Sequence, residues 1–427
     1  MTSADLLGDR PMLGRRAFLG AAAGLAAMPV AGKAAASERV RVAVIGVRSR
    51  GLDHVRLFAA DPGAEIVALC DVDDAMFRRA LAASSINGKA PRVEKDFRRL
   101  LDDKTIDAVS IATPDHWHAI MTIMACQAGK DVYVEKPISH NMVEGRRMVE
   151  AARKHRRVVQ VGTQRRSAPA AIEAIERVRG GAIGKVGMAH AWMHHVRKGI
   201  GHAQPGPLPP GVDYDMWQGP APDRPFHANR FHYNWHWFWV WGTGELGNNG
   251  IHGVDVARWG LGVDAPTAVT SGGGKYVFDD DQEVPDTQVT TWEYPGCCMV
   301  WEHRMWSPHP ESGLPFGVAF HGDKGTLITD GKSWRIEDGD GSQSKPGPDG
   351  QKLHVRDFLD CVKSRNQPNA DIETGHQSTR LCHIGNIAFR TGKKLTFDAD
   401  HECFHDAEAD KLLSREYSSR FSLPAEV

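Results

Sequence analysis

Two short segments carry side chains that can act on a bound ring: Thr113-Pro114-Asp115-His116-Trp117-His118 and Glu135-Lys136-Pro137. Each directly follows an apolar run that we expect to form a strand. Loops at the carboxyl ends of parallel strands are where open α/β sheets bind ligands. Lys136 in such a loop can donate a hydrogen bond to an alkoxide or a carbonyl oxygen, whereas most lysines stay on the solvated surface. We predict that both loops frame one cofactor ring, with contacts from Thr113, Pro114, His118, Glu135 and Lys136.

A glycine turn, Gly46-Val47-Arg48-Ser49-Arg50-Gly51, lies between the first predicted strand and the first predicted helix. The pyrophosphate of a dinucleotide binds at such a place, because the backbone N–H groups of a helix start are unpaired there. Arg48 replaces the middle glycine of Gly-x-Gly-x-x-Gly, and either Arg48 or Arg50 can contact a phosphate instead. The alternative is a plain strand–turn–helix connection. We expect cofactor contacts from Gly46, Arg48, Ser49, Arg50 and Gly51.

Asp71 follows the second predicted strand, about 20 residues after the glycine turn. An acid there accepts hydrogen bonds from a ribose 2′-OH and repels a 2′-phosphate, which favours NAD over NADP. The alternative is a turn or helix-cap aspartate, since Asp71-Val72-Asp73-Asp74 precedes a predicted helix.

The elements that position these residues alternate along the first part of the chain. We expect strands at 40–46, 66–70, 107–113 and 131–134, and helices at 52–59, 75–83, 118–128 and 143–155. This alternation predicts a doubly wound parallel sheet, and we assign residues 37–162 to that domain.

Residues 163–427 differ in composition, with many aromatic residues, glycines and prolines. Candidate strands at 186–193, 268–278, 288–294 and 298–305 predict a mainly antiparallel sheet, interrupted by a helix at 250–260. We expect helices at 355–364 and 377–391 to pack back on the first domain. The fold class is therefore α/β, with two domains.

The N-terminus carries a twin-arginine pattern, Gly14-Arg15-Arg16-Ala17-Phe18-Leu19-Gly20, a short apolar run, and an Ala-x-Ala cleavage site at Ala34-Ala35-Ala36. We predict a Tat signal peptide over residues 1–36 and a periplasmic mature protein with no stable membrane span. The alternatives are a disordered start or a membrane anchor.

The seven cysteines lack a Cys-x-x-Cys pair, so we expect mostly buried free thiols.

The charge balance of the chain argues against nucleic acid as a partner. The 427 residues include 52 lysines and arginines and 53 aspartates and glutamates, for a net charge of −1. Binding to a phosphate backbone favours a basic excess, which is missing.

In order and spacing, the glycine turn, Asp71, Thr113-Pro114, Glu135-Lys136-Pro137 and the helix around residue 252 resemble the Gfo/Idh/MocA oxidoreductase family. The resemblance covers nearly all of the mature chain, and the run from residue 357 to 386 resembles the family's bacterial, often exported branch. It implies a Rossmann domain, an α/β domain whose open antiparallel sheet often mediates homo-oligomers, a nicotinamide between them, and sugar or cyclitol substrates. By position, Lys136 matches the family's active-site lysine and His252 the histidine of Asp-x-x-x-His, although Asn248 stands where the family commonly has Asp.

Oxidation of a secondary alcohol requires a base for the hydroxyl proton and a group that stabilises the oxyanion. We assign the base to His252, oriented by Asp255 three residues on, and the oxyanion contact to Lys136. Asn248 lies four residues before His252, a spacing that shares one helix face, and is predicted to hydrogen-bond the substrate.

Three further interpretations concern the second domain. Arg166, just after a strand, either binds substrate or forms a structural salt bridge. Trp239, in the aromatic run 235–241, is assigned to a sugar-stacking or core wall. The histidines at 194, 195, 232 and 236 lack the spacing of a known ligand set, so no metal site is predicted.

Export restricts the reaction, because a protein outside the cytosol has little access to a nicotinamide pool. We expect a tightly held NAD that is recycled. Oxidation of one sugar coupled to reduction of another satisfies this, as does a redox-neutral glycosidase or lyase reaction through a transient 3-keto intermediate. A third hypothesis is a non-catalytic sugar-binding protein of the same fold.

Overall fold

The computed structural model describes residues 39–84, 90–424 and 426–427. The predicted leader, residues 1–36, lies outside the described residues. Within the described ranges, no helix combines the length and the apolar character that crossing a bilayer would require.

The first domain is a six-stranded sheet in the order β3-β2-β1-β4-β5-β6, in which every neighbouring pair is parallel. The predicted doubly wound sheet is confirmed. Its strands β4 and β5 are entirely buried, as expected for apolar runs covered on both faces. The strands are β1 (Val40–Ile45), β2 (Ala64–Cys70), β3 (Arg92–Glu94), β4 (Ala108–Ile111), β5 (Asp131–Val134) and β6 (Val159–Val161). The helices are α1 (Ser49–Ala60), α2 (Asp74–Ser84), α3 (Arg98–Leu101), α4 (Asp115–Gln127) and α5 (Met142–Lys154).

The second domain contains an eight-stranded sheet in the order β13-β12-β11-β7-β10-β9-β8-β14. The β7–β10 pair is parallel and the other neighbours are antiparallel, so the sheet is mixed but mainly antiparallel, as predicted. Its strands are β7 (Val186–His194), β8 (Ala268–Gly274), β9 (Thr287–Tyr294), β10 (Cys297–Arg304), β11 (Phe316–Gly322), β12 (Gly325–Thr329), β13 (Trp334–Glu337) and β14 (Leu395–Thr396).

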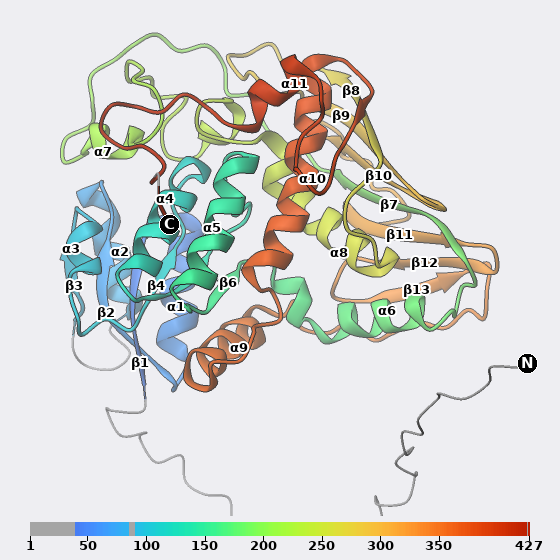
Figure 1. Ribbon diagram of the computed structural model, residues 1–427, viewed down its shortest axis with the longest axis horizontal. Coiled ribbons are helices and arrows are strands. Elements are labelled where there is room, and N and C mark those ends of the chain that lie inside the picture. The colour runs from blue at the N-terminus through green and yellow to red at the C-terminus, as the bar shows by residue number, and fades with distance from the viewer. Residues whose placement is uncertain (1–38, 85–89, 425) are drawn as a thin grey trace, which may run out of the picture.

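Helices α6, α8 and α10 lie against one face of this large sheet (Figure 1). The buried side chains between them form the largest apolar cluster of the second domain, which includes Trp292, Trp301 and Phe320. The helices are α6 (Pro169–Arg179), α7 (Tyr214–Gln218), α8 (Ile251–Leu261), α9 (Gln351–Ser364), α10 (Ile372–Thr391) and α11 (Ala407–Asp410), with 3-10 turns at Gln164–Ser167, Asn234–Trp237 and Lys411–Leu413.

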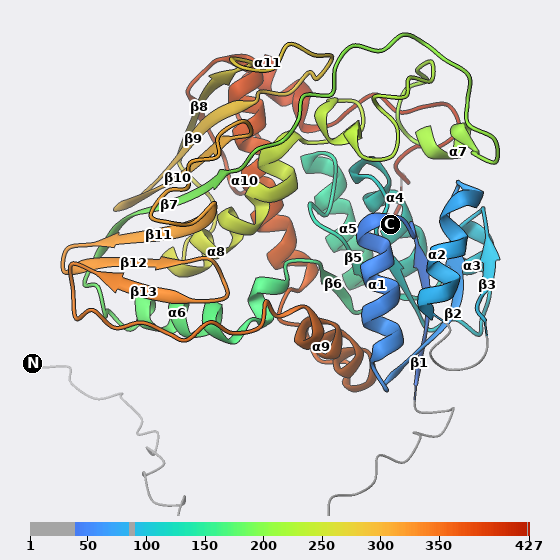
Figure 2. The same cartoon turned by 180° about the vertical axis from the view of Figure 1, so that it is seen from behind.

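Two C-terminal segments return to the first domain. Helix α9 lies beside α1 (Figures 1 and 2), and its Val355 and Phe358 enter the apolar cluster that contains Phe58. The end of the chain runs back over α4, where Val427 is buried against first-domain residues. The two domains therefore share packed surfaces on either side of the parallel sheet.

All seven cysteines are free, and four of them are buried. This agrees with the expectation of buried thiols without disulfide bonds.

Candidate active site

A cavity of about 330 Å³ lies between the carboxyl ends of the parallel strands and the second domain. It brings together most of the predicted site residues from segments far apart in the sequence. From the first domain these are Gly46, Arg48, Ser49, Arg50, Asp71, Thr113, Pro114, His118, Glu135 and Lys136, and from the second domain Asn248 and His252.

The glycine turn forms one end of the cavity. Gly46 has a positive φ of 77°, and a Cβ there would lie 2.6 Å from the Ala112 carbonyl oxygen, so only glycine fits. A Cβ on Gly51 would lie 1.6 Å from the Gly46 oxygen. Gly51 does not line the cavity; it allows α1 to begin against the turn. The start of α1 has no side-chain cap, which leaves its N–H groups available to an anion.

Asp71 lies at the tip of β2 and lines the cavity. Its Oδ2 accepts a hydrogen bond from the Val47 amide at 2.8 Å and its Oδ1 one from the Asp73 amide at 3.1 Å. Burial raises the pKa of Asp71 to about 6. At the start of α2 it is Asp73 Oδ1 that accepts a hydrogen bond from the Ala75 amide, so Asp71 holds the glycine turn and does not cap α2.

Arg50 lines the cavity, and its side chain also belongs to a polar network with Glu135 and Gln351. Its Nε lies 2.7 Å from Glu135 Oε1 and its NH1 donates to Gln351 Oε1 at 2.8 Å. His54 Nε2 lies 2.9 Å from the same Glu135 oxygen. Burial opposes ionisation of Glu135, but the Arg50 charge and the His54 hydrogen bond hold its pKa well below the usual value. The Arg48 side chain, which is exposed at the cavity and forms no hydrogen bond or ion pair with the described residues, is free to meet a phosphate.

His118 connects the loop after β4 to the loop after β5. Its Nδ1 lies 2.7 Å from the Pro137 carbonyl oxygen and its Nε2 2.9 Å from the Thr113 carbonyl oxygen. Burial lowers the pKa of His118. Since both ring nitrogens face main-chain oxygens, His118 fixes the loops that line the cavity, and its predicted direct contact with a cofactor is secondary to that role.

Lys136 is not a solvated surface lysine. Its Nζ donates to the main-chain oxygen of Asn248 at 2.6 Å and lies 3.5 Å from Asn248 Oδ1. Burial lowers the pKa of Lys136, while the carboxylates of Glu135 and Asp115 oppose that shift. The peptide bond between Lys136 and Pro137 is cis. The hydrogen bond to Asn248 holds the ammonium at the boundary of the two domains, where Lys136 lines the cavity.

His252 is the second residue of α8, which continues from a π-helical turn at Leu246–Gly250. The spacing of Asn248 and His252 therefore spans a wider turn than the expected α-helical one, yet both side chains line the cavity. His252 Nδ1 is buried and has no hydrogen-bond partner among the described residues. Burial, followed by the charges of Arg165 and Lys136, lowers the pKa of His252 well below its usual value. The imidazole is thus neutral and can accept a proton.

The predicted roles of Asp255 and Arg166 are wrong. Arg166 Nε and NH2 lie 2.7 to 3.0 Å from the Asp255 carboxylate, and Ser378 Oγ donates to the same group at 2.6 Å. Both members of the ion pair are buried away from the cavity. Asp255 therefore does not orient His252, and Arg166 has the structural salt bridge that was its alternative interpretation.

Trp239 is also misassigned as a substrate contact. Its ring packs under Arg390, with 5.2 Å from the guanidinium carbon to the ring centroid, and it does not line the cavity. The chain turns through a 3-10 helix at Asn234–Trp237, which directs other rings inward. The aromatic wall of the cavity consists of Trp117, Trp217, Tyr233 and Trp235.

Two cavity residues had no role in the sequence analysis. Asp115 accepts a hydrogen bond from Thr243 Oγ1 at 2.7 Å, and burial raises its pKa to about 7. His236 stacks on Trp235, with 3.6 Å between ring centroids. Because Asp115 directly follows Thr113-Pro114, the sequence could have indicated it as a site residue. Nothing in the aromatic run distinguishes His236 in the same way.

Comparison with known proteins matches both halves of the chain to one oxidoreductase family. Residues 40–163 match its NAD-binding Rossmann fold, and residues 183–423 match its C-terminal alpha/beta domain. Inositol 2-dehydrogenase 2 of Saccharopolyspora erythraea is 32% identical over 231 residues, 54% of this chain and 56% of that protein. A glycosyl hydrolase family 109 protein of the same organism is 39% identical over 127 residues, 29% of this chain and 28% of that protein.

The chain thus spans about half the length, or less, of these curated relatives. Among solved structures, the aldose-aldose oxidoreductase from Caulobacter crescentus, complexed with glycerol, aligns with a TM-score of 0.66 at 20% identity. The alignment covers 84% of this chain and 100% of that one. This likeness shows a common fold.

Proposed function

Because the chain belongs to the Gfo/Idh/MocA oxidoreductase family, we propose that it transfers a hydride between NAD and a secondary hydroxyl of a sugar or cyclitol. One observation carries the proposal: Lys136 and His252 line the same cavity as the glycine turn and Asp71. A proton donor, a proton acceptor and a dinucleotide site therefore share one space.

The residues at the cofactor end fit NAD. A Cβ at Gly46 would fill the turn, the first amides of α1 are uncapped, and the Asp71 carboxylate lies at the adjacent strand tip. When bound, NAD supplies the hydride acceptor. Arg48 meets the pyrophosphate and Asp71 the ribose hydroxyls.

At the substrate end, the Lys136 ammonium donates to the reacting oxygen and stabilises its negative charge. The neutral imidazole of His252, which lines the cavity, accepts the hydroxyl proton. Asn248, whose side-chain amide donates to Glu245 at 3.2 Å, presents its oxygens toward Lys136 and helps to place the substrate. The aromatic wall around Tyr233 and Trp235 stacks on the apolar face of a sugar ring.

We further propose that the protein is exported by the Tat pathway to the periplasm and retains its NAD between turnovers. The twin-arginine pattern at Arg15-Arg16 and the Ala34-Ala35-Ala36 site support export. Retention follows because the periplasm offers little free nicotinamide.

We also propose a homo-oligomer that uses the open face of the large sheet, where Val289 is 44% exposed. Light scattering after size-exclusion chromatography tests the oligomeric state.

A redox-neutral glycosidase reaction is the second candidate, and the 39% identity to a glycosyl hydrolase family 109 protein favours it. In that reaction transient oxidation at C3 acidifies the C2 hydrogen, the leaving group departs, water adds and the hydride returns. Lys136 and His252 keep their roles. Incubation with an aryl glycoside in deuterated water separates the two: aglycone release with deuterium at C2 supports elimination, and conversion of free sugars alone supports oxidoreduction.

The proposed function is tested on the mature protein purified without added cofactor. Mass spectrometry of the denatured sample should show bound NAD, and addition of sugars or cyclitols should produce the absorbance of NADH. A protein that binds sugars but yields neither NADH nor cleaved glycoside would be the non-catalytic binding protein, and the proposal would be wrong.

A further inference from the structure

A short loop after β14, residues 397–405, is fixed to the second domain from its inner side. The backbones of Asp398 and Cys403 pair through hydrogen bonds of 2.8 and 3.2 Å. Phe397 and Phe404 are buried and meet edge to face, with 5.3 Å between ring centroids. The loop therefore has one anchored face and one face toward solvent.

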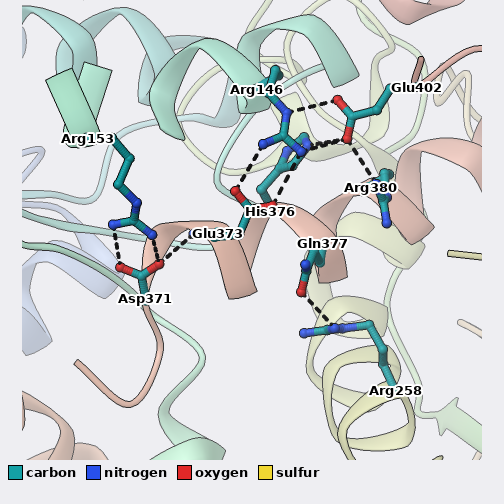
Figure 3. Close-up of polar contacts among 9 residues, drawn as sticks. All are labelled: Arg146, Arg153, Arg258, Asp371, Glu373, His376, Gln377, Arg380 and Glu402. Carbon is teal, nitrogen blue, oxygen red and sulfur yellow. Dashed lines mark hydrogen bonds and ion pairs between the residues drawn. The ribbon is translucent and has the colours of Figure 1, made fainter. Parts of the chain in front are cut away.

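Glu402 supplies the third anchor of this inner side. Figure 3 shows its carboxylate between Arg146 of α5 and His376 and Arg380 of α10, with contacts of 2.9, 2.9 and 3.0 Å. A loop held at Phe397, Glu402 and Phe404 has little freedom to rearrange. The intervening side chains thus keep defined positions.

Four of those side chains converge on the solvent face: Asp398, His401, Cys403 and His405. Asp398 Oδ1 accepts the amides of Asp400 and His401 at 2.9 and 3.0 Å. Its Oδ2 faces both imidazoles, at 2.9 Å from His401 Nδ1 and 3.1 Å from His405 Nε2. Cys403 Sγ lies 3.9 Å from the same His405 Nε2. Ligand atoms of Asp398, Cys403 and His405 all lie within 4.8 Å of one another.

From this cluster we propose that Asp398, Cys403 and His405 bind one zinc ion, with His401 hydrogen-bonded to Asp398 beside it. Ligands about 2.0 to 2.3 Å from a tetrahedral zinc lie roughly 3.3 to 3.7 Å from one another, close to the separations in the loop. One thiolate, one imidazole and one carboxylate are zinc ligands, and all three come from a stretch of eight residues. A water molecule completes a tetrahedral shell around the ion.

The charge around the cluster also suits a cation. Asp398 forms ion pairs only with these two histidines among the described residues, and no lysine or arginine there neutralises it. A second group, His190 with Glu302 and Glu311, differs in this respect. Arg304 Nε lies 2.8 Å from Glu302 Oε1, so an arginine already occupies the place of a cation.

The position of the loop indicates what the ion stabilises. Residues after the loop run back to the first domain, where Arg415 pairs with Glu144 at 2.6 Å and Phe421 packs on Trp117. Trp117 belongs to the aromatic wall of the cavity. A zinc ion at residues 398–405 fixes the start of this C-terminal segment.

Metal analysis of the reduced, full-length protein after zinc addition and gel filtration tests the site. We expect one zinc per chain in the wild type and in the control Cys298→Ser, whose cysteine lies on β10. We expect at least about 100-fold weaker zinc binding in Cys403→Ser, because a thiolate ligand is lost. Equal zinc affinity in Cys403→Ser and in the wild type would overturn the proposal.

X-ray absorption on the zinc-loaded wild type needs no variant and covers the case in which Cys403→Ser fails to fold. The proposal expects one sulfur at about 2.3 Å and three nitrogen or oxygen ligands at about 2.0 to 2.1 Å. A shell without sulfur, or a folded protein that takes up no zinc, would overturn it.

Discussion

The Lys136 ammonium and the main-chain oxygen of Asn248 lie 2.6 Å apart, and this contact joins the loop after β5 to the π-helical turn before α8. This hydrogen bond therefore links the two domains at the cavity, as the bond from Thr243 to Asp115 also does. A substrate oxygen that enters next to Asn248 finds a charged donor already in place. In the proposed mechanism, this preorganised donor stabilises the oxyanion.

Replacing Lys136 with alanine should lower kcat by about 10² to 10³, because one charged donor to the oxyanion is lost. Bound NAD should be unchanged, since the glycine turn and Asp71 remain. Steady-state kinetics and the NAD content of the purified variant measure both effects. Lys104→Ala, at an exposed lysine outside the cavity, is the control, and equal activity of the two variants would refute the assignment.

His252→Gln should lower kcat by about 10² to 10⁴ through loss of the base. The dependence of the wild-type kcat on pH provides a second test, because burial holds the pKa of His252 well below its usual value. The neutral form persists as the pH falls through about 6.5, so kcat should stay level there. A fall in kcat centred near pH 6.5 that disappears in His252→Gln would contradict this account.

Asp71→Ala should raise the affinity for NADP relative to NAD, because the 2′-phosphate no longer meets a carboxylate. Burial raises the pKa of Asp71 to about 6, so the charge that repels NADP is present above that pH and lost below it. In the wild type, the preference for NAD should therefore weaken as the pH falls from 7 to 5. Titration of cofactor-free protein with both dinucleotides measures the ratio, and a ratio independent of pH and of Asp71 would exclude this role.

Arg166→Ala should lower the free energy of unfolding by about 3 to 5 kcal/mol, since it leaves the buried Asp255 carboxylate without its arginine. KM of the folded fraction should not change, because neither residue lines the cavity. Urea unfolding and kinetics measure the two effects. The double variant Arg166→Ala with Asp255→Asn should recover part of the loss, and a specific rise in KM would restore the substrate-binding hypothesis.

Acid should destabilise the fold through buried neutral histidines. Burial lowers the pKa of His354 to about 4 and that of His383 to about 3, against about 6.5 in an unfolded chain. Between pH 6.5 and about 4 the unfolded state binds protons that the folded state does not, so stability falls as the pH falls. Each histidine removes about 1.4 kcal/mol per pH unit in that window. Urea unfolding at pH 7 and pH 5 should show this loss, and equal values would contradict it.

The sequence allowed the parallel sheet and its binding edge to be predicted, because apolar strands, glycine turns and strand-end loops are local signals. Strands β11 to β13 were not predicted. Strand β11 pairs with the distant strand β7, and β12 and β13 join the sheet only through β11. The start of α4 at Asp115, three residues earlier than expected, follows from Pro114 directly before it and an acidic first turn.

Side-chain direction was harder to predict than position along the chain. Arg166 and Asp255 are 89 residues apart and find each other in the core, which no spacing rule indicates. Trp239 packs against Arg390 and an apolar cluster of the second domain and does not line the cavity, which its place in the aromatic run does not indicate. Cys403 gave no signal beyond that of a free thiol, since the loop that gathers its neighbours depends on positive φ angles at Glu402 and His405.

Hydride transfer itself is the most direct test of the central claim. Sugars and cyclitols that carry deuterium on the carbinol carbons are mixed with the NAD-loaded protein, and the nicotinamide is examined by mass spectrometry after an acid quench. The account predicts deuterium in the nicotinamide ring with the wild type and little or none with Lys136→Ala or His252→Gln. A wild-type protein that binds both NAD and sugar, yet transfers no deuterium from any of these compounds, would contradict it.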